Sequence, residues 1–275
     1  MNILISTTTN WNPGDDFIRI GVKNILKHIY PNANYIHYDR NPNNMIEWPH
    51  NQNIKYGLHG NFMNNPIRWE IIDLVVLAGS PEFLHHPLAP IYEGLVNNPH
   101  IPLWAIGVGY SESKFMLPFT DAEKTVLQRE NTIVISRQQE LSNRLQDELD
   151  IAVKTLPCPA LFCFESFPKK TNRMALYVGC HSLSELDRDM YFSTDAYDLL
   201  NYIGSCDYVI SERLHAVIAG ISGGSYCQLE NPNFRTQEAI KLFEPVLESN
   251  PTTIQEFKNN TLTNYLNILK NATKH

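Results

Sequence analysis

The feature that most constrains the fold of this chain is a regular alternation between short apolar runs and longer amphipathic segments. The short runs are bounded by Gly, Pro or Ser, which are residues that favour turns. Short strands separated by helix-length segments are typical of βαβ units around a mainly parallel sheet. The alternation therefore predicts an α/β protein, and a chain of 275 residues is long enough to bury a substantial core.

The first part of the chain contains six of these apolar runs. We predict strands at residues 3–6, 35–38, 74–78, 102–106, 132–136 and 153–156, with helices beginning near Asp15, Leu88, Thr120 and Arg137. The helix near Asp15 is the clearest, because apolar residues recur at helical spacing after two aspartates that can cap its first turn. Residues 39–66 are rich in Asn and Pro and are expected to form a long loop.

A second set of elements follows Pro157-Cys158-Pro159. We predict strands at residues 175–178, 208–211 and 226–229, helices at 195–203, 213–221 and 236–247, and a closing helix with Ile254, Phe257, Leu262, Leu266 and Leu269 near one face. The two sets predict two Rossmann-like domains, residues 1–160 and a smaller domain of residues 161–275 that ends in the terminal helix. Paired open α/β sheets usually bind ligands between them, at the carboxyl ends of the strands.

Composition excludes several classes of function. The 22 Lys and Arg residues against 29 Asp and Glu give a net charge of −7, so no electrostatic attraction to nucleic acid or anionic lipid is expected. No apolar stretch is long enough to span a membrane, and the N-terminus does not resemble a signal peptide. The five cysteines form no CxxC pair and are predicted to be reduced core residues of a soluble cytoplasmic protein.

The strongest candidate for chemistry is the strand that ends at Ser211, because Arg213 and His215 follow it at the start of an apolar helix. A helix N-terminus and a guanidinium both favour phosphate or carboxylate, and histidine carries protons near neutral pH. The alternative is that Arg213 caps the helix or forms an ion pair and that His215 is an ordinary helix residue.

A second strand ends in the same way, with Ser136 followed by Arg137. If one strand belongs to each sheet, Arg137 and Arg213 face one cleft, and two arginines in one cleft indicate an anionic ligand. The alternative is that Arg137 pairs with Glu140 or another nearby acid.

Glycines at other strand ends give weaker support. They occur in Asn12-Pro13-Gly14-Asp15, in Gly79-Ser80 and in Gly107-Val108-Gly109. Glycine lets a backbone approach a ligand closely, although it is also common in ordinary turns. None of these segments forms a P-loop or a complete GxGxxG motif, which argues against ATP and NAD. The pair His85-His86 has no acidic or thiol partner at ligand spacing, so no obligatory metal is expected.

In this order, these segments resemble the polysaccharide pyruvyl transferase family over about residues 3–230. The most specific part is Arg213-Leu214-His215 after its strand; Arg137 with Ser142 and the turn at Pro159-Ala160 also match. The resemblance implies a GT-B-like pair of domains and transfer of a pyruvyl group from phosphoenolpyruvate to sugar hydroxyls. The products are a cyclic ketal and phosphate, and no cofactor besides the donor substrate is needed.

The resemblance also implies site residues. Arg137, Arg213 and His215 would hold the donor and serve catalysis. The residues expected to line the substrate site are Asn12, Gly14, Asp15, Gly79, Ser80, Gly107, Gly109, Ser136 and Leu214. The chain departs from the family pattern where Ala78-Gly79-Ser80 replaces three glycines and where Cys158 replaces an Asp. The segment from residue 178 to 195 is also short for a further βα unit.

Two other functions fit the same fold. One is a GT-B-like glycosyltransferase that uses a nucleotide sugar, and the other is a non-catalytic protein that binds an anion or a glycan. In each case the expected partners are small molecules and carbohydrates.

Overall fold

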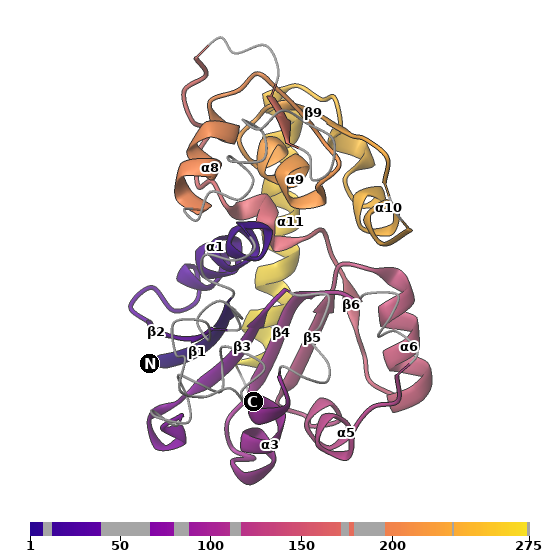
Figure 1. Cartoon of the computed structure of the whole chain (residues 1–275). Coiled ribbons are helices and arrows are strands. Elements are labelled where there is room, and N and C mark those ends of the chain that lie inside the picture. Colours follow the sequence, from indigo (N-terminus) through magenta and orange to yellow (C-terminus); the bar gives the residue numbers. More distant parts are fainter. Residues whose placement is uncertain are drawn as a thin grey trace, which may run out of the picture.

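The structure is a computed structural model that describes residues 1–7, 13–39, 67–79, 88–110, 117–171, 176–178, 196–232 and 234–273. Within these ranges the chain forms two parallel β-sheets with helices around them (Figure 1). The α/β class and the mainly parallel pairing predicted from the alternation are therefore confirmed. Asn12, Ser80, His85, His86, most of the expected loop at 39–66 and residues 179–195 lie outside the described residues.

The larger sheet has the strand order β2-β1-β3-β4-β5-β6, and every neighbouring pair is parallel. Its strands are β1 (Asn2–Thr7), β2 (Asn34–Asp39), β3 (Leu74–Ala78), β4 (Leu103–Val108), β5 (Thr132–Ser136) and β6 (Lys154–Thr155). All six agree with the strands predicted from the sequence to within two residues.

Helices cover both faces of this sheet. Successive side chains of a strand point to opposite faces, and the central strands are buried along their whole length, so both faces carry buried side chains. Leu4, Val75 and Leu77 belong to the core formed with α3 (Ala89–Asn97), α5 (Asp121–Leu127) and α6 (Gln139–Leu149). Ile3 and Ile5 belong to the core on the other face, with α1 (Pro13–Lys27) and α11 (Pro251–Ala272). The short 3-10 helix η2 (Trp69–Ile71) lies between β2 and β3 in the chain.

The smaller sheet has the order β7-β8-β9 and is also parallel. Its elements are β7 (Leu176–Val178), α8 (Ala196–Gly204), β8 (Tyr208–Ser211), α9 (Leu214–Ser222), β9 (Tyr226–Leu229) and α10 (Phe234–Lys241). One prediction is wrong here, since the helix expected at 236–247 ends at Lys241 and a separate 3-10 helix, η4 (Glu244–Val246), follows. Pro245 explains the break, because proline has no N–H and its ring clashes with the preceding turn of a helix.

The two sheets share one apolar core. The 3-10 helix η3 (Pro159–Phe162) connects them, and its Ala160 and Phe162 are buried in the same cluster as Ile3 of β1 and Val209 of β8. The terminal helix α11 runs along both parts of the molecule (Figure 1). The predicted domain boundary at residue 160 stays a prediction.

The buried stripe of α11 differs from the one expected. Ile254 and Leu269 are buried as predicted, but the fully covered positions between them are Lys258, Thr261 and Tyr265. Phe257, Leu262 and Leu266 are only partly buried. Two polar side chains and one tyrosine therefore occupy the face that packs against the core, and their hydroxyl and amino groups need hydrogen-bond partners there.

Cys158, Cys163, Cys206 and Cys227 are buried free thiols, as predicted for these four. Across the described ranges, no helix combines the length and the hydropathy that crossing a bilayer requires.

Candidate active site

The central contact of the candidate site joins the two sheets. Arg137 lies between the end of β5 and the start of α6, and its side chain is almost completely buried. His215 is the second residue of α9, which follows β8 of the smaller sheet. The distance from Arg137 Nη1 to His215 Nε2 is 2.8 Å. The convergence expected for these two residues is thus present, and Arg137 contacts His215 rather than Glu140.

The donor and acceptor roles in this contact follow from chemistry. A guanidinium carries only N–H donors, so His215 Nε2 must accept the hydrogen bond. We therefore assign a neutral imidazole with its hydrogen on Nδ1. A doubly protonated ring in the same position would place two cations in contact. The Nε2 lone pair is therefore occupied by the N–H of Arg137.

Arg137 has an unusual environment for a buried cation. Its Nε atom is buried and has no hydrogen-bond partner, and no carboxylate contacts its guanidinium among the residues that the structure describes. By contrast, buried Arg19 on α1 lies 2.7 Å from Asp16 Oδ1. A buried charge without a counter-ion is strongly unfavourable, so an anionic ligand at Arg137 would remove a real energetic cost.

Cys158 does not supply the missing negative charge. Its Sγ atom lies 3.7 Å from Arg137 Nη1. Burial raises the pKa of the Cys158 thiol, and the attraction of Arg137 only partly opposes this effect. The residue that stands where the family usually has an aspartate is therefore a neutral thiol at physiological pH.

Gln138 is a second donor beside Arg137 that the sequence analysis missed. Its side chain is 1% exposed, Oε1 accepts a hydrogen bond of 2.8 Å from the Tyr110 amide, and Nε2 has no partner among the described residues. Ser136 Oγ holds the turn by accepting from the Gln138 amide at 3.0 Å. An unsatisfied buried donor costs about 1–3 kcal/mol, which makes Gln138 Nε2 a second group that a ligand acceptor would satisfy. Its position directly after Arg137 at a strand end was the available signal.

Two of the predicted glycines make room for site side chains. A Cβ atom on Gly14, in the first turn of α1, would lie 2.5 Å from His215 Nδ1. A Cβ atom on Gly109 would lie 2.5 Å from Gln138 Oε1 and 2.9 Å from Arg137 Nε. Both glycines therefore allow a backbone to approach the residues that form the site.

The other two glycines serve the packing of the backbone. Gly107 has φ +68°, lies at a register shift between β4 and β5, and would place a Cβ 2.2 Å from Pro159 Cδ. Gly79 has φ +65° and would place a Cβ 2.6 Å from Ile18 Cγ2. Whether any of the four glycines also approaches a ligand stays a prediction.

The remaining predicted residues lie around the first turns of α1 and α9. Asp15 is buried in the first turn of α1, and Leu214 is the buried first residue of α9. Arg213 precedes α9, and its amide donates to Ser211 Oγ at 2.8 Å. The first turn of α9 thus begins directly at the carboxyl end of β8, as the sequence predicted.

Tyr265 of α11 supports the segment that carries Cys158. Its hydroxyl donates to the Pro157 carbonyl at 2.8 Å, and its fully buried ring packs edge-on against Phe162. The terminal helix therefore holds the backbone next to Cys158 in place through this hydrogen bond. The apolar pattern of this helix gave no sign of that role.

The fold and the site together define an α/β protein of GT-B-like architecture with a buried arginine–histidine contact between its two sheets. The polysaccharide pyruvyl transferase family model matches residues 12–224, which include Arg137 and His215. The chain belongs to the polysaccharide pyruvyl transferase family. No match is found among curated protein sequences.

Solved structures support the fold. A functionally uncharacterised protein from Klebsiella pneumoniae is similar with a TM-score of 0.56 and 11% identity, over 90% of this chain and 91% of that one. A putative UDP-N-acetylglucosamine 2-epimerase from Listeria monocytogenes is similar with a TM-score of 0.56 and 10% identity, over 95% of this chain and 90% of that one. At these identities the similarity extends to the fold alone.

Proposed function

We propose that this protein transfers a pyruvyl group from phosphoenolpyruvate to hydroxyls of a glycan or glycan precursor, forming a ketal and releasing phosphate. The observation that carries the proposal is the buried Arg137 guanidinium, which contacts His215 and has no carboxylate partner among the described residues. The family membership supplies the reaction class.

Phosphoenolpyruvate fits the chemistry of this site because it carries both a carboxylate and a phosphate. Arg137 Nε–H and the side-chain amide N–H of the neighbouring Gln138 have no hydrogen-bond partner in the part of the chain that the structure describes. Guanidinium groups bind carboxylate and phosphate through paired hydrogen bonds, so one acidic group of the donor would lie at Arg137. Arg213, at the start of α9, is the proposed partner of the other acidic group.

His215 is the proposed proton carrier. In the first step protonated His215 gives its proton to the methylene carbon of phosphoenolpyruvate, which becomes a methyl group, and a sugar hydroxyl adds to the central carbon and returns its proton to the imidazole. In the second step phosphate leaves with the electron pair of its C–O bond, a second hydroxyl of the sugar attacks the same carbon, and the proton of that hydroxyl passes to the released phosphate. His215 would take up its proton when the donor binds and occupies the Arg137 N–H, because the negative charge of the donor stabilises the imidazolium.

The proposal assigns a small anionic donor and a carbohydrate acceptor as partners, with no further cofactor. A cytoplasmic location agrees with the four buried free cysteines.

The test is phosphate release from phosphoenolpyruvate in the presence of candidate sugars. We expect His215→Ala to lower the rate about 10²- to 10⁴-fold. Arg137→Lys should weaken donor binding, because lysine cannot form the paired hydrogen bonds of arginine. Matched controls are His28→Ala, at the exposed end of α1, and Arg68→Ala, whose side chain is 66% exposed. Both controls should react like the unmodified protein.

Three results would overturn the proposal. Phosphate release that is unchanged in His215→Ala would remove the assigned role of this residue. Thermal stabilisation by UDP or GDP, without stabilisation by phosphoenolpyruvate, would favour a glycosyltransferase that uses a nucleotide sugar. Binding of phosphoenolpyruvate with no turnover of any acceptor would favour a non-catalytic anion-binding protein.

A further inference from the structure

A cavity lies at the other end of α1 from the candidate active site. Its volume is about 380 Å³, within the range of about 300–1,000 Å³ that is usual for small-molecule pockets. The residues that line it are Asn24, Ile25, Lys27, His28, Phe162, Phe164, Glu165, Gln255, Lys258, Asn259 and Leu262. Asn24 lies ten residues after Gly14, or about 15 Å along the helix, so the two sites are separate.

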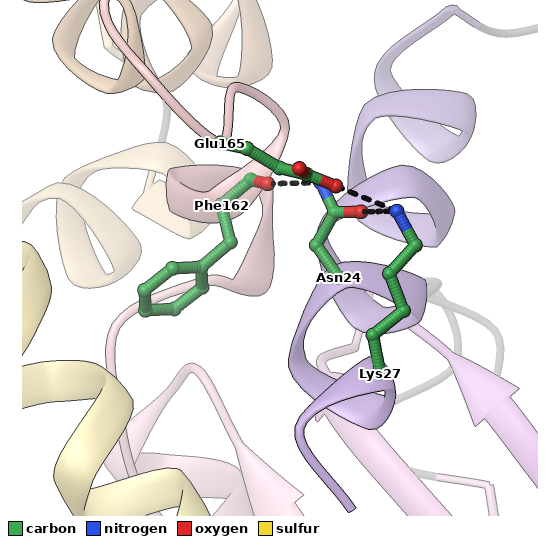
Figure 2. Close-up of polar contacts among 4 residues, drawn as sticks. All are labelled: Asn24, Lys27, Phe162 and Glu165. Atoms are coloured by element: carbon green, nitrogen blue, oxygen red, sulfur yellow. Dashed lines mark hydrogen bonds and ion pairs between the residues drawn. The ribbon is translucent and has the colours of Figure 1, made fainter. Parts of the chain in front are cut away.

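One wall of this cavity is a chain of polar contacts between α1 and the segment after η3 (Figure 2). Lys27 Nζ lies 2.6 Å from Glu165 Oε1 and donates to Asn24 Oδ1 at 2.9 Å. Asn24 Nδ2 in turn donates to the Phe162 carbonyl at 2.9 Å. The charge of Lys27 is therefore balanced by Glu165, and both the oxygen and the nitrogen of the Asn24 side-chain amide form hydrogen bonds.

The cavity also contains a charge that is not balanced. Lys258 of α11 is 4% exposed, and its Nζ donates to the carbonyls of Phe164 and Ser222 at 3.0 Å each. The ring centroid of Phe167 lies 5.3 Å from the same atom. No carboxylate contacts Lys258 within the described part of the chain. An ammonium has three N–H donors; carbonyls use two of them, and the third has no oxygen or nitrogen acceptor among the described residues.

Burial lowers the pKa of Lys258 to about 8, which leaves the group mostly protonated at pH 7. A buried positive charge of this kind is stabilised by a nearby anion. Among the other lining side chains, Ile25 and Phe162 are apolar and buried, and Leu262 is apolar and partly buried. The cavity thus combines one uncompensated cation with an apolar surface.

We propose that this cavity is a binding site for a small amphipathic carboxylic acid, with the carboxylate at Lys258 and the apolar part against Ile25, Phe162 and Leu262. The carboxylate would take the third N–H of the ammonium and supply the missing counter-charge. Because the walls come from α1, from the segment after η3 and from α11, the ligand would contact elements on both sides of the connection between the two sheets.

The experiment is isothermal titration calorimetry at pH 7 with two acids, 3-phenylpropionate and hexanoate, and with the corresponding neutral amides. We expect both acids to bind, and each amide to bind at least about tenfold more weakly, because the amide brings no charge to Lys258. Lys258→Met should abolish the preference for the acid over the amide.

A second variant, which fills the cavity with a large side chain, tests binding without removing Lys258, so its result does not depend on the stability of Lys258→Met. Asn259 lines the cavity and is exposed, so Asn259→Trp should fill the mouth and abolish binding without disturbing the core. The adjacent Asn260 is exposed and does not line the cavity, so Asn260→Trp is the matched control and should bind normally. Absence of binding at millimolar acid, equal binding of acid and amide, or full binding by Asn259→Trp would each overturn the proposal.

Discussion

His215 Nδ1 packs so closely over Gly14 that a Cβ atom at position 14 would lie 2.5 Å from it. Real Cβ contacts are never this short, so Gly14→Ala must push the imidazole away from α1 and from Arg137. Alanine is a better helix former than glycine, which should keep the thermal midpoint within a few degrees. We expect the proposed pyruvyl transfer to fall about a hundredfold, because catalytic groups tolerate little displacement.

The ring NMR signals of His215 give a measurement that does not depend on the assigned reaction. They should shift in Gly14→Ala. Gly223→Ala is the control, because a Cβ there would meet its nearest neighbours at 3.3 Å and lies away from His215. Unchanged His215 signals in Gly14→Ala would show that the close packing does not exist in solution.

Gly107→Ala should destabilise the protein. The residue has φ +68°, which is unfavourable for alanine, and the new methyl group would lie 2.2 Å from Pro159 Cδ. The combined backbone strain and overpacking should lower the free energy of unfolding by about 1–3 kcal/mol, as measured by urea denaturation. A loss below about 0.5 kcal/mol, the size of an ordinary surface effect, would contradict this packing.

Tyr265→Phe removes one hydroxyl and leaves the Pro157 carbonyl without its donor. The ring keeps its contact with Phe162, so the expected loss in the free energy of unfolding is about 1 kcal/mol. Tyr208→Phe, at a side chain that is 47% exposed, is the control and should change stability by less than about 0.5 kcal/mol. Equal effects of the two substitutions would mean that the hydrogen bond to Pro157 contributes nothing.

The buried Lys258 predicts a pH dependence of stability. Its pKa in the folded protein is about 8, below the 10.5 of an exposed lysine. Between these values the unfolded chain binds more protons than the folded one. The cost of burying this group therefore falls, and the free energy of unfolding rises, as pH increases from 8 to 10. Lys258→Met abolishes the effect, and the stability of the unmodified protein relative to this variant should increase by about 2 kcal/mol over that interval.

The comparison with Lys258→Met is needed because other groups act in the opposite direction. Burial raises the pKa of Cys163 to about 12. Because an exposed thiol loses its proton at lower pH than this buried one, the free energy of unfolding falls as pH rises above the pKa of an exposed thiol. Urea denaturation at pH 7, 8, 9 and 10 for both proteins gives the contribution of Lys258, which includes its electrostatic interaction with Cys163. A stability difference that stays constant from pH 8 to 10 would contradict the lowered pKa of Lys258.

Much of the fold could be predicted from local pattern. The bounds of β3, β5, β8 and β9 match the predicted runs at both ends. For β3, which is buried along its whole length, the reason is that a buried strand of a parallel sheet is a short apolar run between turn residues. The helix expected to continue to residue 247 shows the limit of apolar spacing. Pro245 lies inside that stretch and was available as a signal to end it.

The candidate site could be predicted only in part. Arg137 and His215 each follow a strand, and the rule that parallel strands collect side chains at their carboxyl ends was enough to select them. Tyr265 and Lys258 were missed because nothing local distinguishes them from exposed polar residues, and Gln138 was missed although it follows Arg137 at a strand end. Their importance arises from burial, which depends on what packs over them.

The amino-acid sequence by itself determined the order and the type of the elements, because hydrophobic periodicity acts over neighbouring residues. Only the tertiary structure decided which polar groups meet. The contact between Arg137 and His215 joins residues that are 78 positions apart, and the unbalanced charges of Arg137 and Lys258 depend on which carboxylates the folded chain brings near them. Hydrogen bonding and charge compensation act through space, and no local pattern encodes that proximity.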